Sequence, residues 1–216
     1  RPLVITDGVF PTFGVIAPVP EILKELEPYN GILCLDDAHA VGVLGANGRG
    51  TCEHFGLKPG DRLIMSGTLS KAFGGHGGFV PASGAFIQKI KQTVGAYSGA
   101  SSPPTPIAAA SAKGIELVQS HPEWREKLRH NVARIKKGMR ELGFDVGDSP
   151  MPVVTWALQS AEEMKKVQKE LLDKGSALPS TKYIGAPSGG VLRASIFSAH
   201  TDAHIDQLLA ELKKRI

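Results

Sequence analysis

The stretch DRLIMSGTLSKAFGGHGGFV, residues 61–80, sets one lysine between an apolar run and a series of glycines. The apolar run, DRLIMS (61–66), is short and typical of a buried β-strand. Glycines between positions 74 and 78 allow close approach of the backbone. We therefore expect Lys71 to be buried in a site, where burial lowers the pKa of an amine and frees it for Schiff-base chemistry. A solvated lysine on a surface loop is the alternative.

Strand and helix patterns alternate on either side of this stretch in the first half of the chain. Strands separated by helices or long connections predict parallel crossovers. We therefore expect an α/β domain with a mostly parallel sheet and helices on both faces. The predicted strands are LVIT (3–6), GILCLDD (31–37), DRLIMS (61–66) and GGFVPAS (77–83), and the predicted helix is VPEILKELEPY (19–29), which Pro20 can start.

The second half carries long helical patterns and few strands. Their order predicts a smaller α+β domain, with a boundary near residue 122. We therefore expect one domain at 1–122 and another at 123–216. The expected elements are an Ala-rich helix at 106–118, a helix at 123–142, a strand at 151–158, a helix at 161–175, a strand at 191–197 and a helix at 202–216.

The composition limits the class of protein. With 216 residues, 42% of them hydrophobic, the chain can bury a substantial core. It has no apolar run of the ~20 residues that cross a bilayer and no secretory signal pattern, so we expect a cytoplasmic protein. The net charge of +4 comes mostly from amphipathic helical faces, which argues against a nucleic-acid or membrane surface. The two cysteines form no disulfide framework.

Polar side chains gather after the predicted strands 31–37 and 61–66. Ligands of parallel α/β sheets bind beyond the carboxyl ends of the strands. We therefore expect an acid, an imidazole, hydroxyls and a lysine to meet at one edge of the sheet. These residues are Asp36, Asp37, His39, Ser66, Thr68, Ser70 and Lys71.

These residues also fit simpler or different functions in part. DDAH can be a helix cap followed by a buried histidine, and Thr68 can serve a turn. A metal site built on the two aspartates, His39 and either Cys52 or His54 lacks zinc spacing, so we expect no metal. The Gly-x-Ser-x-Gly of serine hydrolases is absent. Pyridoxal phosphate would use all the groups at once, since it needs a lysine, a carboxylate, phosphate-binding hydroxyls and a donor for its phenolate oxygen.

Ordered motifs along the whole chain resemble those of the α-oxoamine synthases. The motifs are VITDGVFPTFGVIAPVPEI (4–22), CLDDAHAVGVLGANGRG (34–50), SGTLSKAFGGHGGFV (66–80) and VLRASIFSAHT (191–201). This family consists of fold-type-I pyridoxal phosphate enzymes that join an amino acid to an acyl-CoA with loss of CoA. The resemblance implies such a C-acyltransferase, with residues 1–122 as the C-terminal part of the large cofactor-binding domain and 123–216 as the small domain.

The resemblance also implies roles for individual residues. Lys71 would bind the cofactor aldehyde as a Schiff base and act as acid and base at the substrate α-carbon. Asp36 would pair with the pyridine nitrogen and keep it protonated, and His39, the second catalytic residue, would contact the phenolate oxygen. Thr68 would touch the phosphate. Arg193 would hold the carboxylate of the amino acid, because a guanidinium can bind both of its oxygens.

The chain departs from the family in two places. The glycine-rich phosphate loop and the ring-stacking residue that precede ITDGVF in the family are missing, so we expect a C-terminal portion that is a fragment, a processed product or a separate subunit. In YSGASSPP (97–104), Gly99 and Ala100 replace the usual hydroxyl-bearing residues. Ser101 keeps a hydroxyl, which implies a phosphate contact across a homodimer with a shared active site, or a polar turn. No role is assigned to His76 or His200.

Within the family we expect an enzyme like 8-amino-7-oxononanoate synthase or glycine C-acetyltransferase. One alternative is a catalytically inert or half-site subunit of such an enzyme. The presence of Asp36, His39, Lys71 and Arg193 argues against an inert subunit, which has no chemical reason to keep them. The other alternative is a related pyridoxal phosphate aminotransferase or lyase, which would not release CoA from an acyl-CoA.

Overall fold

The computed structural model describes residues 1–182 and 185–214. The chain forms two compact units. The first comprises Arg1–Val9 with Ile16–Pro122, and the second comprises Phe10–Val15 with Glu123–Ile216. Two short strands, β2 (Val9–Phe10) and β3 (Val15–Ile16), pair with each other where the chain leaves and re-enters the first unit. Residues 1–122 and 123–216 remain the proposed domains.

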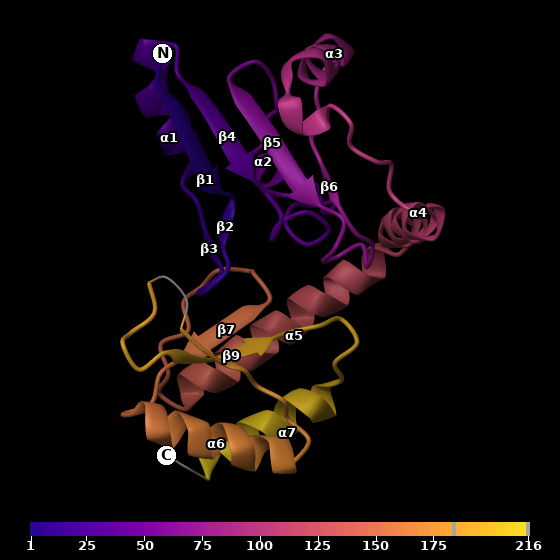
Figure 1. Ribbon diagram of the computed structural model, residues 1–216. Coiled ribbons are helices and arrows are strands. Elements are labelled where there is room, and N and C mark those ends of the chain that lie inside the picture. Colours follow the sequence, from indigo (N-terminus) through magenta and orange to yellow (C-terminus); the bar gives the residue numbers. More distant parts are fainter. Residues whose placement is uncertain (183–184, 215–216) are drawn as a thin grey trace. The chain divides into compact units, whose positions relative to one another are not determined.

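A mixed sheet lies at the centre of the first unit (Figure 1). In spatial order its strands are β1 (Leu3–Asp7), β4 (Ile32–Asp36), β5 (Leu63–Thr68) and β6 (Gly78–Phe79). β1, β4 and β5 are parallel, which confirms the mostly parallel sheet. The prediction of a long strand over 77–83 was wrong, because β6 has two residues and is antiparallel to β5. Residues 69–77 return directly, without the crossover that a parallel strand requires.

The helices of the first unit begin at recognisable start signals. α1 (Val19–Leu26) carries Pro20 in its first turn, where no backbone N–H is needed. α3 (Gly84–Thr93) was not predicted, although Ser83 caps it by accepting a hydrogen bond from the backbone N–H of Phe86. The other helical segments are η1 (Glu27–Tyr29), α2 (Thr51–His54), η2 (Gly95–Tyr97) and α4 (Thr105–Ser120).

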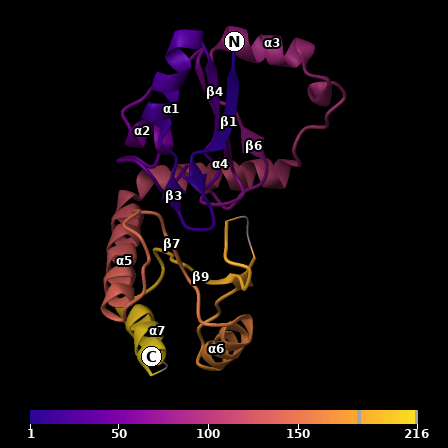
Figure 2. The ribbon, with the colours of Figure 1, turned by 90° about the vertical axis from the view of Figure 1, so that its left-hand side faces the viewer.

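One face of the first sheet carries a hydrophobic core. Leu33 and Leu35 of β4 are buried, whereas Cys34 between them is half-buried, the alternation expected for a strand with one packed face. Val19 and Leu26 of α1 belong to the same cluster of buried residues, and Figure 2 shows α1 beside the sheet. This burial fixes the strand register, because a slip by one residue would move both leucines to the other face.

The second unit combines an antiparallel sheet with helices, as the predicted α+β pattern requires. Its strands, in the order β7-β9-β8, are β7 (Val153–Trp156), β9 (Val191–Ser195) and β8 (Ser180–Thr181). Its helices are α5 (Pro122–Glu141), α6 (Ala161–Asp173) and α7 (Asp202–Lys213). The last part of the predicted helix 202–216, residues 215–216, lies outside the described residues. Within residues 1–182 and 185–214, no helix has the length and apolar character that crossing a bilayer requires.

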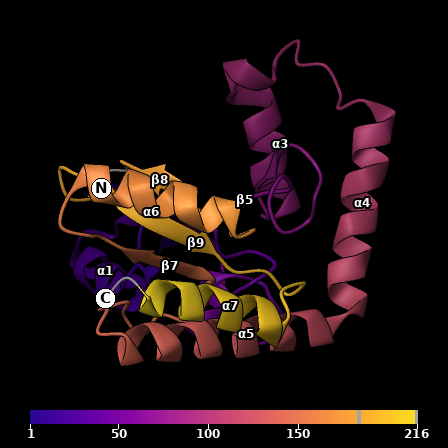
Figure 3. The same cartoon turned by 90° about the horizontal axis from the view of Figure 1, so that it is seen from below.

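A second hydrophobic core joins these helices to β7 and β9. Ile135 of α5, Leu171 of α6 and Leu192 of β9 are all 0% exposed within it. α5 and α7 run side by side (Figure 3), and a polar contact joins them at the surface. There, Nη2 of Arg134 in α5 donates to both carboxylate oxygens of Asp206 in α7 at 2.7 Å. Most of the stabilisation of this unit therefore comes from burial, since exposed ion pairs contribute little.

Replacing Leu192 by alanine is expected to destabilise the second unit by about 2–5 kcal/mol, because it leaves a cavity in a packed core. Leu172→Ala is the matched control, since Leu172 is 58% exposed and the same atoms are removed at the surface. The control should change the free energy of unfolding by less than about 0.5 kcal/mol. Urea denaturation followed by circular dichroism measures both variants. Equal losses would contradict this assignment of the core.

Candidate functional site

The carboxyl ends of β1, β4 and β5 lie next to one another in the first unit. In the parallel register, Asp7 of β1 pairs with Asp36 of β4, and Asp36 pairs with Ser66 of β5. Thr68 is the last residue of β5 and pairs with Gly78 of β6. The polar residues that follow β4 and β5 therefore start from neighbouring strand ends, at the edge where parallel sheets bind ligands.

Asp36 closes β4 with an exposed side chain. Its Oδ1 accepts a hydrogen bond from the backbone N–H of Ala38 at 2.9 Å, which ties the carboxylate to the turn that follows. His39 is half-buried in that turn. The turn closes around His39 because the backbone N–H of Ala40 donates to the carbonyl oxygen of Asp37 at 2.9 Å. Asp36 and His39 are thus held in one short, hydrogen-bonded segment.

Lys71 lies in the loop that returns from β5 to β6. The backbone N–H of Leu69 donates to Gly77 at 2.9 Å, and that of Gly75 donates to Leu69 at 2.8 Å, so the loop is closed on itself. The Lys71 side chain is exposed. The expectation that Lys71 is buried was therefore wrong for this chain. Gly75 and Gly78 bring the backbone close to its neighbours, but they do not enclose the lysine side chain.

Because glycine has no side chain, Gly75 and Gly114 allow this loop to lie against α4. A Cβ added to Gly75 would lie 2.1 Å from Oγ of Ser111, and one added to Gly114 would lie 1.8 Å from the carbonyl oxygen of Phe73. The backbone N–H of His76 also donates to Oγ of Ser111, at 3.3 Å. Helix and loop therefore touch backbone to backbone, which only glycine permits at these positions.

The segment after β4 meets the lysine loop at another point. A Cβ on Gly42, whose φ is +84°, would lie 2.4 Å from Cβ of Ala72. Farther along, the Glu53 carboxylate accepts hydrogen bonds from the backbone of Asn47 at 2.9 Å and of Arg49 at 3.0 Å. Burial raises the pKa of Glu53, but hydrogen bonds from Asn47 and Arg49 outweigh this effect and hold the pKa below its usual value. The ionised Glu53 carboxylate therefore holds the backbone of residues 47–49 in place.

Hydroxyl groups stand at the start of the lysine loop. Oγ1 of Thr68 and Oγ of Ser70 lie 2.7 Å apart. The Thr68 hydroxyl also donates to the carbonyl oxygen of Gly77 at 3.1 Å and accepts from the backbone N–H of Ser70 at 3.2 Å. Ser101, in contrast, is exposed in the irregular stretch between η2 and α4. Thr68 is therefore held in place by the loop itself, whereas Ser101 lies on an open segment.

Asp37 has surroundings that differ from those of Asp36. It is 0% exposed, and Thr51 donates to both of its carboxylate oxygens. Burial raises the pKa of Asp37, the Thr51 hydrogen bonds oppose that rise, and the charge of Asp36 adds to it. Burial, and then the charge of Asp37, raises the pKa of Cys52 to about 11, so Cys52 is a neutral thiol at pH 7. No group of potential metal ligands is found among residues 1–182 and 185–214.

Arg193 belongs to the second unit, where it lies on β9 opposite Thr155 of β7. Its Nη1 donates to Oγ of Ser195 at 2.6 Å. Its Nε is buried and has no hydrogen-bond partner among the described residues. A buried N–H group without an acceptor is uncommon, and a carboxylate is the partner that a guanidinium binds most strongly. Arg193 is therefore a candidate anion-binding residue of this unit.

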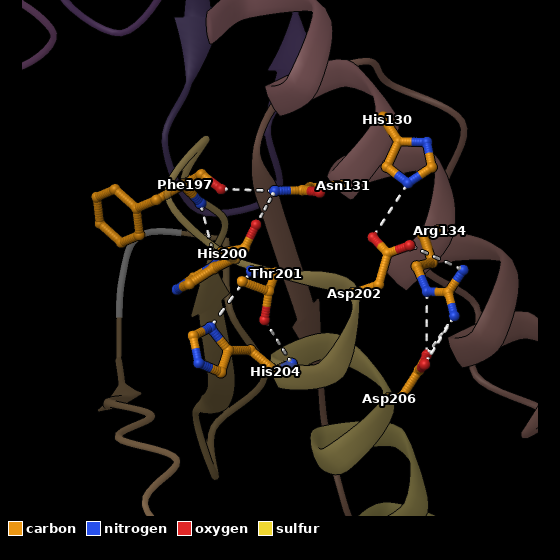
Figure 4. A network of polar contacts seen from close by, with 9 residues as sticks. All are labelled: His130, Asn131, Arg134, Phe197, His200, Thr201, Asp202, His204 and Asp206. Atoms are coloured by element: carbon orange, nitrogen blue, oxygen red, sulfur yellow. Dashed lines mark hydrogen bonds and ion pairs between the residues drawn. The ribbon is translucent and has the colours of Figure 1, made fainter.

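Side-chain hydrogen bonds hold the segment that follows β9 (Figure 4). Nδ2 of Asn131 in α5 donates to the carbonyl oxygens of Phe197 and His200, both at 2.9 Å. Nδ1 of His200 accepts from the backbone N–H of Phe197 at 3.2 Å, and Thr201 caps α7. Burial, followed by the nearby His204, lowers the pKa of His200. Protonation would turn the accepting nitrogen into a donor and break its bond with Phe197.

The sequence did not indicate the residues that fix the turn after β4, the lysine loop and the segment after β9. These residues are Thr51, Glu53, Ser111 and Asn131. Each of them acts through a tertiary contact. Thr51, for example, bonds to a residue 14 positions earlier, and Ser111 to one 35 positions earlier. Small polar residues carry no periodicity that would distinguish them. Gly75 did indicate a close backbone approach, but not the helix that it approaches.

Comparisons with known proteins agree on one family. The profile described as aminotransferase class I and II matches residues 1–212. The 8-amino-7-oxononanoate synthase of Thioalkalivibrio sulfidiphilus (strain HL-EbGR7) is 38% identical over 213 residues, which cover 98% of this chain and 54% of that protein. The chain spans about half the length of the curated relatives that it matches.

Solved structures show the same relationship. A high-resolution structure of SPT with PLP internal aldimine matches with a TM-score of 0.89 and 28% identity, over 98% of this chain and 54% of that chain. The crystal structure of 8-amino-7-oxononanoate synthase from Francisella tularensis matches with a TM-score of 0.85 and 25% identity, over 100% of this chain and 63% of that chain. The similarity therefore extends over both units.

Gly114→Ala is expected to loosen the lysine loop, because its Cβ would collide with the carbonyl oxygen of Phe73. The amide of Gly75 should then exchange with solvent at least about tenfold faster, as measured by hydrogen–deuterium exchange. Gly84→Ala is the matched control, since Gly84 is also a helical glycine but no atom of the described part of the chain lies within 4 Å of the added Cβ. Unchanged exchange over residues 69–77 in the first variant would contradict the backbone contact.

His200→Asn is expected to remove a pH dependence of stability, because Oδ1 of asparagine can accept the same hydrogen bond without titrating. The pKa of His200 is lowered by folding, so the unfolded chain takes up the proton first as pH falls below about 6.5. The contribution of His200 to the free energy of unfolding is therefore fully present above that pH and decreases below it. Urea midpoints at about pH 7.5 and about pH 5 test this. The parent and the variant should have the same urea midpoint at the higher pH. Equal decreases of the midpoint in both proteins at the lower pH would refute the role of His200.

Proposed function

Because the chain belongs to the aminotransferase class I and II family, we propose that it supplies the cofactor lysine and its partners to a pyridoxal phosphate-dependent acyltransferase. The proposed reaction joins an amino acid to an acyl-CoA, gives an amino ketone and releases CoA. Relatives named 8-amino-7-oxononanoate synthase and a solved structure named SPT with PLP support it. The proposal concerns the whole protein, since the chain spans about half the length of those relatives.

The placement of Asp36 and Lys71 carries this proposal. Asp36 ends β4, and its partner in register, Ser66, lies on β5 just before the loop that contains Lys71. An acid and an amine therefore leave neighbouring parallel strands at the same edge of one sheet. A pyridine nitrogen and an aldehyde on one small ring need this pair of groups close together.

The chemistry of the other donors fits the same cofactor. Lys71 offers an exposed amine, and Asp36 an exposed carboxylate. The Thr68 and Ser70 hydroxyls lie 2.7 Å apart at the start of the lysine loop, where a phosphate could replace Gly77 as the acceptor of the Thr68 proton. In the second unit, the buried Nε of Arg193 has no acceptor among residues 1–182 and 185–214, and a substrate carboxylate could provide one. The chain thus holds the kinds of groups that pyridoxal phosphate and an amino acid require.

Each residue at the sheet edge has a proposed task. When bound, pyridoxal phosphate supplies an electron sink for the negative charge that develops at the substrate α-carbon. Nζ of Lys71 would hold the cofactor and take the proton from that carbon, and it would return a proton there where the carboxylate leaves as CO2 after the new C–C bond has formed. The Asp36 carboxylate places a negative charge beside the ring nitrogen and keeps it protonated. His39 donates a hydrogen bond to the phenolate oxygen.

The remaining residues bind charged groups and connect subunits. Thr68 is assigned to the phosphate, and Ser101 to the phosphate of the cofactor in a neighbouring subunit. Arg193 is assigned to the substrate carboxylate, because a planar guanidinium binds both oxygens. The shared site implies a homodimer. We propose a cytoplasmic enzyme with an amino acid and an acyl-CoA as its substrates.

Lys71→Arg is expected to abolish covalent attachment of the cofactor, because a guanidinium keeps the charge but does not form a Schiff base. The protein is incubated with pyridoxal phosphate, reduced with borohydride and mapped by mass spectrometry, and the parent should carry the label on Lys71. Lys89→Arg, on the exposed face of α3, is the matched control and should keep the label. Release of CoA thiol with glycine, alanine or serine should fall on the order of 10²–10⁴-fold in Lys71→Arg.

Different outcomes separate the alternatives. A label on Lys71 without release of CoA from any acyl-CoA would contradict the acyltransferase and favour an aminotransferase or a lyase. No label on Lys71 would contradict the role of this lysine and favour an inert or half-site subunit. A label together with steady release of CoA would support the proposal in full.

A further inference from the structure

Asp37 is fully buried beside the proposed site, and none of the tasks assigned above uses it. We propose that Asp37 is a positioning residue, which together with Thr51 fixes the end of β4 and the following turn so that Asp36 and His39 serve the same site. The part of this inference that concerns the cofactor rests on the proposed function. The part that concerns the turn stands on the contacts of Asp37 alone.

Thr51 holds both oxygens of the Asp37 carboxylate. The backbone N–H of Thr51 donates to Oδ2 at 2.7 Å, and its hydroxyl donates to Oδ1 at 2.5 Å. Thr51 is itself 0% exposed and is the first residue of α2. A carboxylate without hydrogen bonds is costly to bury, so this pair of donors is what makes the position of Asp37 tolerable. The strand end is thereby tied to the start of a helix.

Glycines form the walls around this carboxylate. A Cβ added to Gly8 would lie 2.1 Å from Oδ1 of Asp37, and one added to Gly50 would lie 1.9 Å from Oδ2. Gly50 also has a φ of +90°, which side chains rarely allow. The space is therefore filled by the carboxylate and by backbone, so Asp37 has no room to change its direction.

The backbone of Asp37 connects three further segments. Its N–H donates to the carbonyl oxygen of Ser66 in β5 at 2.9 Å. Its carbonyl oxygen accepts from Ala40 at 2.9 Å and from Val41 at 3.0 Å, and these two bonds close the turn that contains His39. Movement of Asp37 would therefore displace that turn relative to the strand that leads to Lys71.

This arrangement gives the two adjacent acids different tasks. Asp36 is the last residue of β4 and is exposed, whereas Asp37, the next residue, is enclosed. Thr51 donates to both oxygens of Asp37, and Gly8 and Gly50 enclose the carboxylate, so Asp37 is not open to a ligand. Burial raises the pKa of Asp37 and the Thr51 hydrogen bonds oppose that rise, which agrees with an anchoring role. Asp36 keeps its direction because Asp37 is fixed.

Thr51→Val tests the inference, because it removes the hydroxyl donor with little change of shape and leaves the backbone donor in place. Without pyridoxal phosphate, the amides of Ala40 and Val41 should exchange with deuterium at least about tenfold faster. With pyridoxal phosphate, its dissociation constant should rise on the order of 10–100-fold, as expected when a supporting contact behind a ligating residue is lost. Thr51→Ser restores the hydroxyl and should rescue both measurements.

Thr93→Val is the matched control, since its hydroxyl also bonds to backbone, at 2.8 Å, but lies on an exposed part of α3. It should alter neither measurement. Faster exchange confined to residues 38–41, together with weaker cofactor binding and rescue by serine, supports the inference. Unchanged exchange there, or an equal increase throughout the first unit, overturns it. If the parent protein binds no pyridoxal phosphate, the proposed function fails, and the exchange data alone decide whether Asp37 fixes the turn.

Discussion

The parallel pairing of β4 with β5 is the constraint on which the rest of the site depends. It aligns Asp36 with Ser66, so the chain leaves both strands at the same edge of the sheet. The register is set by the apolar face, where Leu33 and Leu35 are buried. A slip by one residue would expose these leucines and move Asp36 to the packed face. The position of the polar edge is therefore a consequence of the hydrophobic core beneath it.

The fold could be predicted where local pattern and tertiary structure agree. The buried runs of β4 and β9 and the amphipathic α5 and α6 were found close to their predicted positions. β5 was predicted at 61–66 but occupies Leu63–Thr68, because pairing of Gly67 with Phe79 extends the strand. Such an extension depends on a partner strand, which no local pattern shows. The helix at 84–93 was overlooked even though Ser83 provides a helix cap before it.

The site could be predicted to the level of strand ends and no further. Period-two burial and the edge rule for parallel sheets bring Asp36 and Lys71 to the same edge. The burial of Lys71 was predicted wrongly, because glycines report how closely the backbone approaches its neighbours and not whether a side chain is covered. Thr51 could not be found at all, since it supports the site through a contact across 14 residues.

In each unit, adjacent residues in or just after a strand divide into a buried anchor and an available group. In the first unit, Asp37 is 0% exposed and bonded to Thr51, while its neighbour Asp36 is exposed. In the second, Leu192 is buried in the core, while Arg193 is half-buried and shares the other face of β9 with Ser195. A sequence motif treats such neighbours as one block. The physical difference between them is the face on which each lies, so chemistry has to be assigned to single positions and not to the motif as a whole.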